Sequence, residues 1–266
     1  MGARMATFVL LLILFSILVA FPNVGIVKAE NTIQINRDGS VDGTDFIQRN
    51  NDTYTFLNDI SGTIVVFKDF ITIDGVGFTL NGSSYSPQTG IDLTFRKNVT
   101  VKNLVIINYE VGIFCRPGAG TTTNITIWGN YIHNCDIGIE FQGTSNNLIK
   151  FNTFKNNSID ISIEYVLGNN LITQNSVDSY VQVWMSDQPT IDMNYWTAYN
   201  GTDNDGDGIG DTPYYYHDVL QDNHPLINPV PVIPEFPSWI ILPLFLVSTL
   251  ALLLAKRRIK FVGFKK

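Results

Sequence analysis

The sequence predicts an all-β protein: a right-handed, single-stranded parallel β-helix (solenoid) with an N-terminal cap, followed by a C-terminal transmembrane helix. Two observations predict the solenoid. A short alternating motif that ends in asparagine returns about every 22 residues between residues 99 and 196, and a second alternating stretch returns with it. A third observation predicts the membrane helix, because an unbroken apolar run near the C-terminus ends in basic residues.

The first repeated strand carries an isoleucine shortly before the asparagine, as in "ITIWGN", "NLIKFN" and "NLITQN". Successive apolar residues are 26, 22, 23 and 19 positions apart. Equivalent residues of stacked coils lie about 4.8 Å apart, so we expect an aliphatic ladder inside and an asparagine ladder at the bends. The apolar column is Val101, Ile127, Ile149, Ile172 and Ile191; the asparagines are Asn130, Asn152, Asn175 and Asn194; a further apolar column is Ile132, Phe154, Val177 and Trp196.

A second strand in each turn is predicted from the triplets "IDL" at 91, "VGI" at 111, "IGI" at 137, "IDI" at 159 and "VQV" at 181. The outer residues are apolar, which indicates a strand with one buried face. The alternative fold, an antiparallel sandwich with chance periodicity, gives asparagine no reason to return at one offset. The central residues of the triplets are expected to face outward: Asp92, Gly112, Gly138, Asp160 and Gln182.

A stack of coils leaves unpaired backbone at both ends, so each end needs a cap. Residues 30–70 lack the repeat but read as short strands and turns, and they are the expected N-terminal cap. The repeats are expected over residues 71–198. Residues 199–230 contain an acidic loop and are expected to close the other end of the stack.

The two ends of the chain predict export and anchoring. Residues 1–29 have the anatomy of a secretory signal peptide, and an uncleaved anchor helix is the alternative. After a linker at 231–238, residues 239–255 form the apolar run, which is about 25 Å long as a helix at ~1.5 Å per residue. The basic tail at 256–266 is expected to stay in the cytoplasm, which places the β-helix outside the cell membrane.

The composition of the chain limits its possible binding partners and covalent modifications. The formal net charge of −7 argues against nucleic acid. The two cysteines, Cys115 and Cys135, allow one disulfide or two buried thiols. Six sequons mark glycan sites if the host glycosylates, although an Asn- and Thr-rich chain produces sequons by chance: Asn51, Asn81, Asn98, Asn124, Asn156 and Asn200.

The stretch "DNDGDGIGD" at 203–211 predicts a structural calcium site. Alternate aspartates followed by glycine are the order in which a calcium-binding loop supplies oxygen ligands and then turns. The bidentate glutamate of an EF-hand is missing, because Tyr214 stands at the twelfth position, and Asp218 or Asp222 is the expected replacement. The alternative is an acidic turn without metal. The expected ligands are Asp203, Asp205, Asp207, Asp211 and the backbone carbonyl of Ile209.

The segment "NYWTAYNGTDNDGDGIGDTPYYYHDVLQDNHPL" after asparagine-bearing coils resembles the closing segment of NosD-like right-handed parallel β-helix proteins, many of them archaeal surface proteins. The resemblance covers roughly residues 33–228. The tail "PEFPSWIILPLF" is similar to archaeal anchoring tails that begin Pro-Glu-Phe. The NosD name implies copper, but His133, His217 and His224 share no metal-ligand spacing, and no copper site is predicted.

The sequence leaves catalysis open. Hydrolysis of a glycoside needs two carboxylates ~5 to 10 Å apart. Asp160 and Glu140 are the best pair, Asp136 is a third candidate, and solvated surface carboxylates are the simpler interpretation. Lys102 and Lys150 lie on coils but beside no carboxylate cluster that would suit a lyase.

Two functions therefore stand beside each other. The first is a membrane-anchored surface module that binds polysaccharide or a cell-surface protein without catalysis. The second is a polysaccharide hydrolase or lyase.

Overall fold

The fold comes from a computed structural model of the chain, which describes residues 32–82, 89–116, 123–165, 168–184, 187–216 and 220–231. Sheet A contains, in spatial order, β2 (Val41–Asp42), β1 (Thr32–Ile35), β6 (Thr63–Val66), β9 (Thr89–Asp92), β12 (Val111–Cys115), β15 (Ile137–Gln142), β18 (Ile159–Glu164) and β21 (Val181–Trp184). Sheet B contains β22 (Thr190–Asp192), β19 (Leu171–Thr173), β16 (Leu148–Lys150), β13 (Thr126–Trp128), β10 (Val99–Lys102), β7 (Ile71–Asp74), β4 (Thr53–Phe56) and β3 (Ile47–Asn50). Sheet C contains β23 (Tyr195–Trp196), β20 (Ser176–Val177), β17 (Thr153–Lys155), β14 (Tyr131–His133), β11 (Val105–Ile107), β8 (Thr79–Asn81) and β5 (Ile60–Ser61). A separate hairpin contains β24 (Tyr214–Tyr216) and β25 (Leu220–Asp222).

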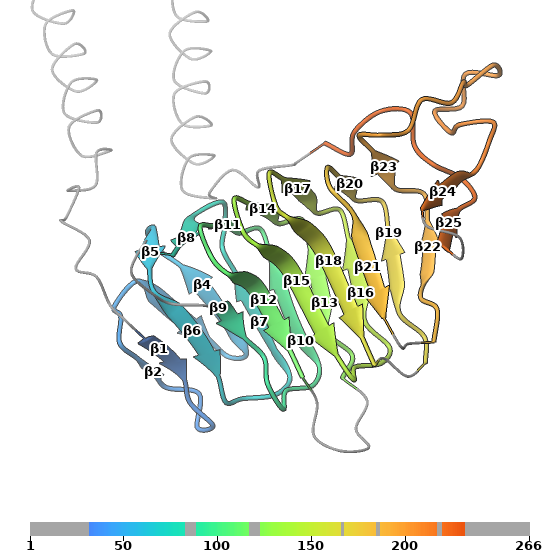
Figure 1. The fold of residues 1–266 in the computed structure, drawn as a ribbon. Helices are drawn as coiled ribbons and strands as arrows, with labels where there is room; N and C mark the ends of the chain where they lie inside the picture. The colour runs from blue at the N-terminus through green and yellow to red at the C-terminus, as the bar shows by residue number, and fades with distance from the viewer. Residues whose placement is uncertain are drawn as a thin grey trace, which may run out of the picture.

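The three long sheets are the sides of a solenoid, because the chain passes through sheets B, C and A once in each turn. The first complete turn is β4–β5–β6 and the sixth is β19–β20–β21, followed by β22 and β23 (Figure 1). Successive turns pair in parallel in all three sheets. The predicted all-β parallel solenoid is therefore confirmed. The further apolar column of the sequence belongs to a third strand in each turn, in sheet C.

The aliphatic ladder lies inside the solenoid as predicted. Ile127 pairs in register with Ile149, and Ile149 pairs with Ile172. All three side chains are at most 2% exposed. Burial of each contributes up to about 1.5–3 kcal/mol to stability. Since one apolar row comes from each sheet, the interior is a continuous column of aliphatic and aromatic side chains.

The bend between sheets B and C uses left-handed backbone. The five equivalent residues that follow sheet B have φ between 54° and 64°: Asn103, Gly129, Phe151, Gln174 and Met193. Glycine and asparagine tolerate this conformation best, so phenylalanine, glutamine and methionine at three of these sites show that stacking dictates the bend.

The residues that follow the bend form the predicted asparagine ladder. Asn130 Nδ2 donates to Asn152 Oδ1 (3.0 Å), Asn152 Nδ2 to Asn175 Oδ1 (3.1 Å), and Asn175 Nδ2 to Asn194 Oδ1 (3.0 Å). The backbone N–H of Asn130, Asn152 and Asn175 donates to the same oxygens. All four side chains are 0% exposed. The ladder has a direction, because each amide accepts from the preceding coil and donates to the next.

Asp222 ends this ladder. Its carboxylate accepts hydrogen bonds from the backbone N–H of Met193 (2.9 Å) and Asn194 (2.8 Å) and from Trp196 Nε1 (3.0 Å). Asp222 is 1% exposed and belongs to β25 of the hairpin. The last rung has no following coil to donate to, so a side chain with acceptors alone meets its needs.

The N-terminal end is closed by antiparallel pairs, β1 with β2 and β3 with β4. Parallel stacking begins earlier than residue 71, however, because β4 pairs in parallel with β7 and β6 with β9. Residues 53–66 therefore form the first turn of the solenoid and not part of the cap. The repeated motif is recognisable in the sequence only from residue 99 onward, so periodicity did not reveal this turn.

The register of the second strand differs from the prediction in two coils. Ile113 pairs with Ile91 and with Ile139, and Val181 pairs with Ile161. The triplets "IDL" and "VQV" are thus each displaced by two residues. A shift of two residues keeps every side chain on its face, so alternation alone could not reveal it.

The expectation that the central residue of each triplet faces outward is wrong for Gly112, Gly138 and Asp160. Asp160 has the position that Gly90, Gly112 and Gly138 have in the three preceding coils, at a bend near the start of the sheet A strands. All four positions are buried. A Cβ atom on Gly138 would lie 2.6 Å from the carbonyl oxygen of Asp160 in the next coil. A side chain fits at this position only where the next coil is shorter, and glycine is required elsewhere.

The predicted signal peptide (1–29), residues 232–238 of the linker, the apolar run (239–255) and the basic tail (256–266) lie outside the described residues. Within the part of the chain that the structure describes, no helix is long and apolar enough to cross a membrane. Cys115 and Cys135 are two buried free thiols. None of the six sequon asparagines is buried.

Candidate metal loop and binding face

The acidic loop brings three of the predicted ligands together. One carboxylate oxygen from each of Asp203, Asp205 and Asp207 lies within 4.8 Å of the others. The loop folds around its own side chains, because Asp203 accepts hydrogen bonds from the N–H of Gly206 (2.7 Å) and Gly208 (3.0 Å). Partial desolvation pushes the pKa of Asp203 upward, but these N–H groups outweigh it and hold the pKa below its usual value.

The other predicted ligands do not belong to this group of three carboxylates. Asp211 Oδ2 accepts a hydrogen bond from Thr202 Oγ1 (3.1 Å) and from the N–H of Asn204 (3.1 Å), which ties the two ends of the loop together. Ile209 forms an antiparallel bridge with Leu226, beside the chain that leaves the cap. Asp222 is buried in the ladder end, so its expected role as a ligand is wrong, and Asp218 lies outside the described residues.

The outer side of sheet A gathers a second group of carboxylates. Gln142 Nε2 donates to Glu140 Oε1 (2.6 Å) and lies 3.5 Å from Glu164 Oε2, on the next coil. Burial is the largest influence on Glu140 and raises its pKa, and the charges of Glu164 and Glu110 raise it further against the Gln142 hydrogen bond. The sequence analysis named Glu140 but not Glu164. The feature that could have indicated Glu164 is its separation of 22 residues, one coil, from Gln142.

Two exposed aromatic side chains border these carboxylates. Trp184 pairs in register with Glu164 and is 55% exposed, and Tyr165 at the following bend is 51% exposed. Their ring centroids are 6.2 Å apart. We define Glu140, Gln142, Glu164, Tyr165 and Trp184 as the sheet A face. It combines flat apolar surface with hydrogen-bonding groups.

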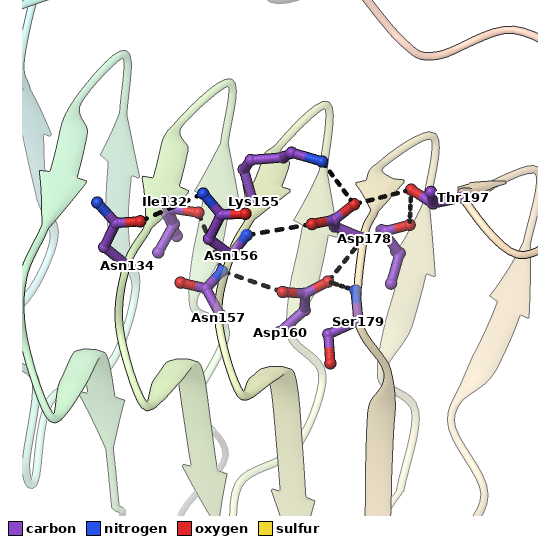
Figure 2. Close-up of polar contacts among 10 residues, drawn as sticks. Ile132, Asn134, Lys155, Asn156, Asn157, Asp160, Asp178, Ser179 and Thr197 are labelled. Carbon is purple, nitrogen blue, oxygen red and sulfur yellow. Dashed lines mark hydrogen bonds and ion pairs between the residues drawn. The ribbon is translucent and has the colours of Figure 1, made fainter.

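Asp160 lies near the start of β18, four residues before Glu164, and is closed to solvent. Its carboxylate accepts from Asn157 Nδ2 (3.0 Å) and from the N–H of Asp178 (2.8 Å) and Ser179 (2.7 Å), as Figure 2 shows. Burial raises the pKa of Asp160 to about 6, although these donors lower it. A group that is 0% exposed and already accepts three hydrogen bonds inside the protein cannot reach a substrate, so Asp160 does not form a catalytic pair with Glu140.

A shortened coil explains this arrangement. The chain advances eight positions from Thr153 to Ile161, but only five between their register partners Ser176 and Val181. The Asp160 carboxylate occupies the space that the missing residues leave. Asp136, the third candidate, is exposed in the bend before β15, where its N–H donates to Tyr109.

An apolar groove lies at the corner between sheets B and C. Its volume is about 270 Å³, and its lining includes Lys102, Asn103, Trp128 and Phe151 together with the chain at Val230–Pro231. The rings of Trp128 and Phe151 are 5.7 Å apart. The groove is separate from both the loop and the sheet A face, since Trp128 belongs to sheet B.

The match to a known family spans most of the solenoid and the acidic loop. A family described as "Periplasmic copper-binding protein (NosD)" matches residues 21–215. The chain belongs to the NosD family. No curated protein and no solved structure matches the chain. The family description is that of a periplasmic protein, which agrees with the export predicted for this NosD-family chain.

Across the described segments of this NosD-family chain the donor atoms do not suit copper, and His217 lies outside those segments. Copper sites favour imidazole and sulfur ligands. His224 Nδ1 is engaged by Asp192 Oδ1 (2.8 Å) at the C-terminal end, far along the stack from His133 in β14. Burial raises the pKa of the Cys115 thiol to about 12 and that of Cys135 to about 11, so neither offers a thiolate.

Among the described residues, the aspartates of the loop are the grouping of metal-ligating side chains close enough to share an ion. Carboxylate oxygens are hard ligands and suit calcium, magnesium or manganese. The candidate site of this NosD-family chain is therefore an acidic metal triad at the end of the stack.

Proposed function

We propose that the protein is a membrane-anchored module outside the cytoplasm that binds glycans through the sheet A face, without catalysis. The observation that carries the proposal is the exposed Trp184–Tyr165 pair beside Gln142 and Glu164. Aromatic faces pack against the apolar faces of sugar rings, while amide and carboxylate groups accept hydrogen bonds from sugar hydroxyls.

The parallel stack adds a second reason. Coils repeat about every 4.8 Å, so polar side chains on the sheet A face recur along a line that an extended chain of sugar units can follow. Ser162 lies between Glu140 and Gln182 in this line, and its hydroxyl has no hydrogen-bond partner among the described residues. A ligand hydroxyl that displaces the covering side chains would complete it.

Glycan-array binding of the full chain in detergent, followed by calorimetry, tests this proposal. Trp184→Ala should weaken binding roughly 10-fold or more, as loss of a central aromatic contact does. Tyr215→Ala is the matched control, because Tyr215 is 70% exposed but belongs to the β24–β25 hairpin and not to sheet A. Equal affinities of wild type and Trp184→Ala would contradict the sheet A face as the site.

For the acidic loop we propose calcium as the bound ion, with a structural role. Three clustered carboxylates repel one another, and a divalent ion between them would remove that repulsion and hold the C-terminal cap. Calcium titrated into the metal-free protein should release or absorb heat and raise Tm, and Asp205→Asn should weaken both effects. Asp136→Asn, on the exposed bend, should change neither. Absence of heat and of a Tm shift would contradict the site.

A hydrolase remains the second candidate, and one observation favours it. Glu140 and Glu164 are bridged by Gln142, and a raised pKa on one of two neighbouring carboxyl groups suits a proton donor. A screen for reducing ends and unsaturated products over a panel of polysaccharides tests this activity. Turnover that disappears in Glu140→Gln and Glu164→Gln, but not in Asp136→Asn, would replace the binding proposal.

A further inference from the structure

The C-terminal segment leaves the solenoid in the middle of its length and not at its end. After the cap, Leu226 pairs in parallel with Tyr195 as one more rung of sheet C. The chain then turns back, and Val230 N–H donates to Ser176 Oγ (2.9 Å), one coil earlier. At Pro231 it lines the groove formed by coils that carry β10, β13 and β16.

The groove at this exit has the composition of a surface that meets a lipid interface. Trp128 is 46% exposed, and it lies in sheet B between Lys102 and Lys150 of the adjacent coils. Lys150 Nζ lies 4.6 Å from the ring centroid of Phe151. Tryptophan and lysine are the residues that favour the boundary between headgroups and acyl chains. Lys102 Nζ is paired with Asp74 Oδ2 (2.9 Å), so Lys150 is the lysine of this surface that would attract anionic lipid.

Chain length limits how far this groove can lie from a membrane. Seven residues, 232–238, separate Pro231 from Trp239, where the apolar run begins. Seven extended residues span at most ~25 Å, at ~3.6 Å each. If residues 239–255 cross the bilayer, the middle of the solenoid is held within that distance of its surface, whereas an exit at the end of the stack would have left most coils free.

We propose that the groove corner of the solenoid rests on the surface of an anionic membrane, with Trp128, Phe151 and the two lysines in contact with lipid. The axis of the stack then lies along the membrane. Sheet A, the side of the solenoid across from the corner between sheets B and C, faces away from the lipid. This inference rests on the anchoring part of the proposed function, and it explains how the sheet A face would stay open to ligands.

The test uses the full chain in liposomes that contain anionic lipid. Spin labels are placed at Thr126→Cys, on the outer side of sheet B, and at Gln182→Cys, on the outer side of sheet A. Cys115 and Cys135 are buried and should stay unlabelled. The label at 126 should collide with lipid-soluble oxygen and be shielded from an aqueous nickel chelate, while the label at 182 should show the reverse.

A pair of variants assigns the contact to the groove. The double change Trp128→Ser with Phe151→Ser should move the label at 126 towards the aqueous pattern. Trp184→Ser, which removes a comparably exposed tryptophan from sheet A, should leave the label at 126 unchanged. Trp128 and Trp184 are exposed and Phe151 is half-buried, so neither variant removes a core side chain, and both should keep a Tm close to that of the wild type, which the same samples report.

Each contrary result has a distinct meaning. Protein that alkaline carbonate washes from the liposomes would overturn the anchoring and this inference together. Anchored protein with an aqueous label at 126 would overturn the membrane contact alone. Shielding at 126 that persists in the absence of lipid would mean that residues after Pro231 cover the groove themselves, and it would also overturn the contact.

Discussion

The middle coils and the C-terminal end of the solenoid use different residues to satisfy the buried hydrogen-bonding groups at the bend after sheet B. In the middle, Asn130, Asn152 and Asn175 each accept from one neighbour and donate to the next. At the end, Asp222 only accepts. Asparagine and aspartate are nearly the same size, so the difference shows that the direction of the ladder, and not shape, decides which residue fits.

The largest effect is expected at the ladder end. Asp222→Asn places an amide NH₂ against the N–H groups of Met193 and Asn194, and at least one buried donor loses its acceptor. The free energy of unfolding should fall by about 3 kcal/mol, the range for lost hydrogen bonds to a buried charged group. Urea unfolding measures it, with Asp136→Asn as the exposed control. A loss equal to that of the control would refute the ladder-end role.

The reverse exchange in the middle should also destabilise. Asn152→Asp removes the donor to Asn175 Oδ1. It also buries a carboxylate beside an amide oxygen that can only accept a hydrogen bond. We expect a loss of about 2 kcal/mol near neutral pH, which should become smaller at pH 4 as the new carboxyl takes up a proton. Urea unfolding at the two pH values measures this difference. An Asn152→Asp protein as stable as wild type would show that the ladder has no direction.

Asp160 should make the free energy of unfolding depend on pH in the opposite direction from a carboxylate in a salt bridge. Its pKa is raised to about 6, so the folded protein holds a proton that the unfolded chain releases near pH 4. The contribution of Asp160 to the free energy of unfolding should therefore fall as the pH rises from 4 to 6. The difference between wild type and Asp160→Asn, measured by urea unfolding across this range, should follow that slope. A flat difference would contradict the raised pKa.

The smallest effect is expected in the metal-free loop. Asp205 is exposed and its carboxylate accepts a hydrogen bond from the N–H of Asp207 within the loop, so Asp205→Asn without calcium should change the free energy of unfolding by about 0.5 kcal/mol or less. Chemical denaturation in the presence of a chelator measures this effect. A large loss would mean that the loop supports the cap without any ion.

The parts of the fold that repeat were accessible from the sequence, and the parts that occur once were not. Ile127, Ile149 and Ile172 recur at similar steps, so their common row could be predicted. Asp222 lies 28 residues after Asn194 and reaches the ladder only because the hairpin folds back, which no periodicity records. The shortened coil that buries Asp160 is visible in the 19-residue step, but the space it leaves depends on packing.

The candidate site divides in the same way. The acidic triad could be predicted because Asp203, Asp205 and Asp207 are neighbours in the chain. Glu164 was missed because its relation to Glu140 passes through Gln142, across two coils whose register had to be known first.

A crystal structure of the full chain would decide whether like residues stack over like and end on Asp222. The account predicts that Ile127, Ile149 and Ile172 form one inward row, and that the Asp222 carboxylate binds the N–H groups of Met193 and Asn194. An antiparallel sandwich, or an Asp222 side chain in solvent, would contradict it.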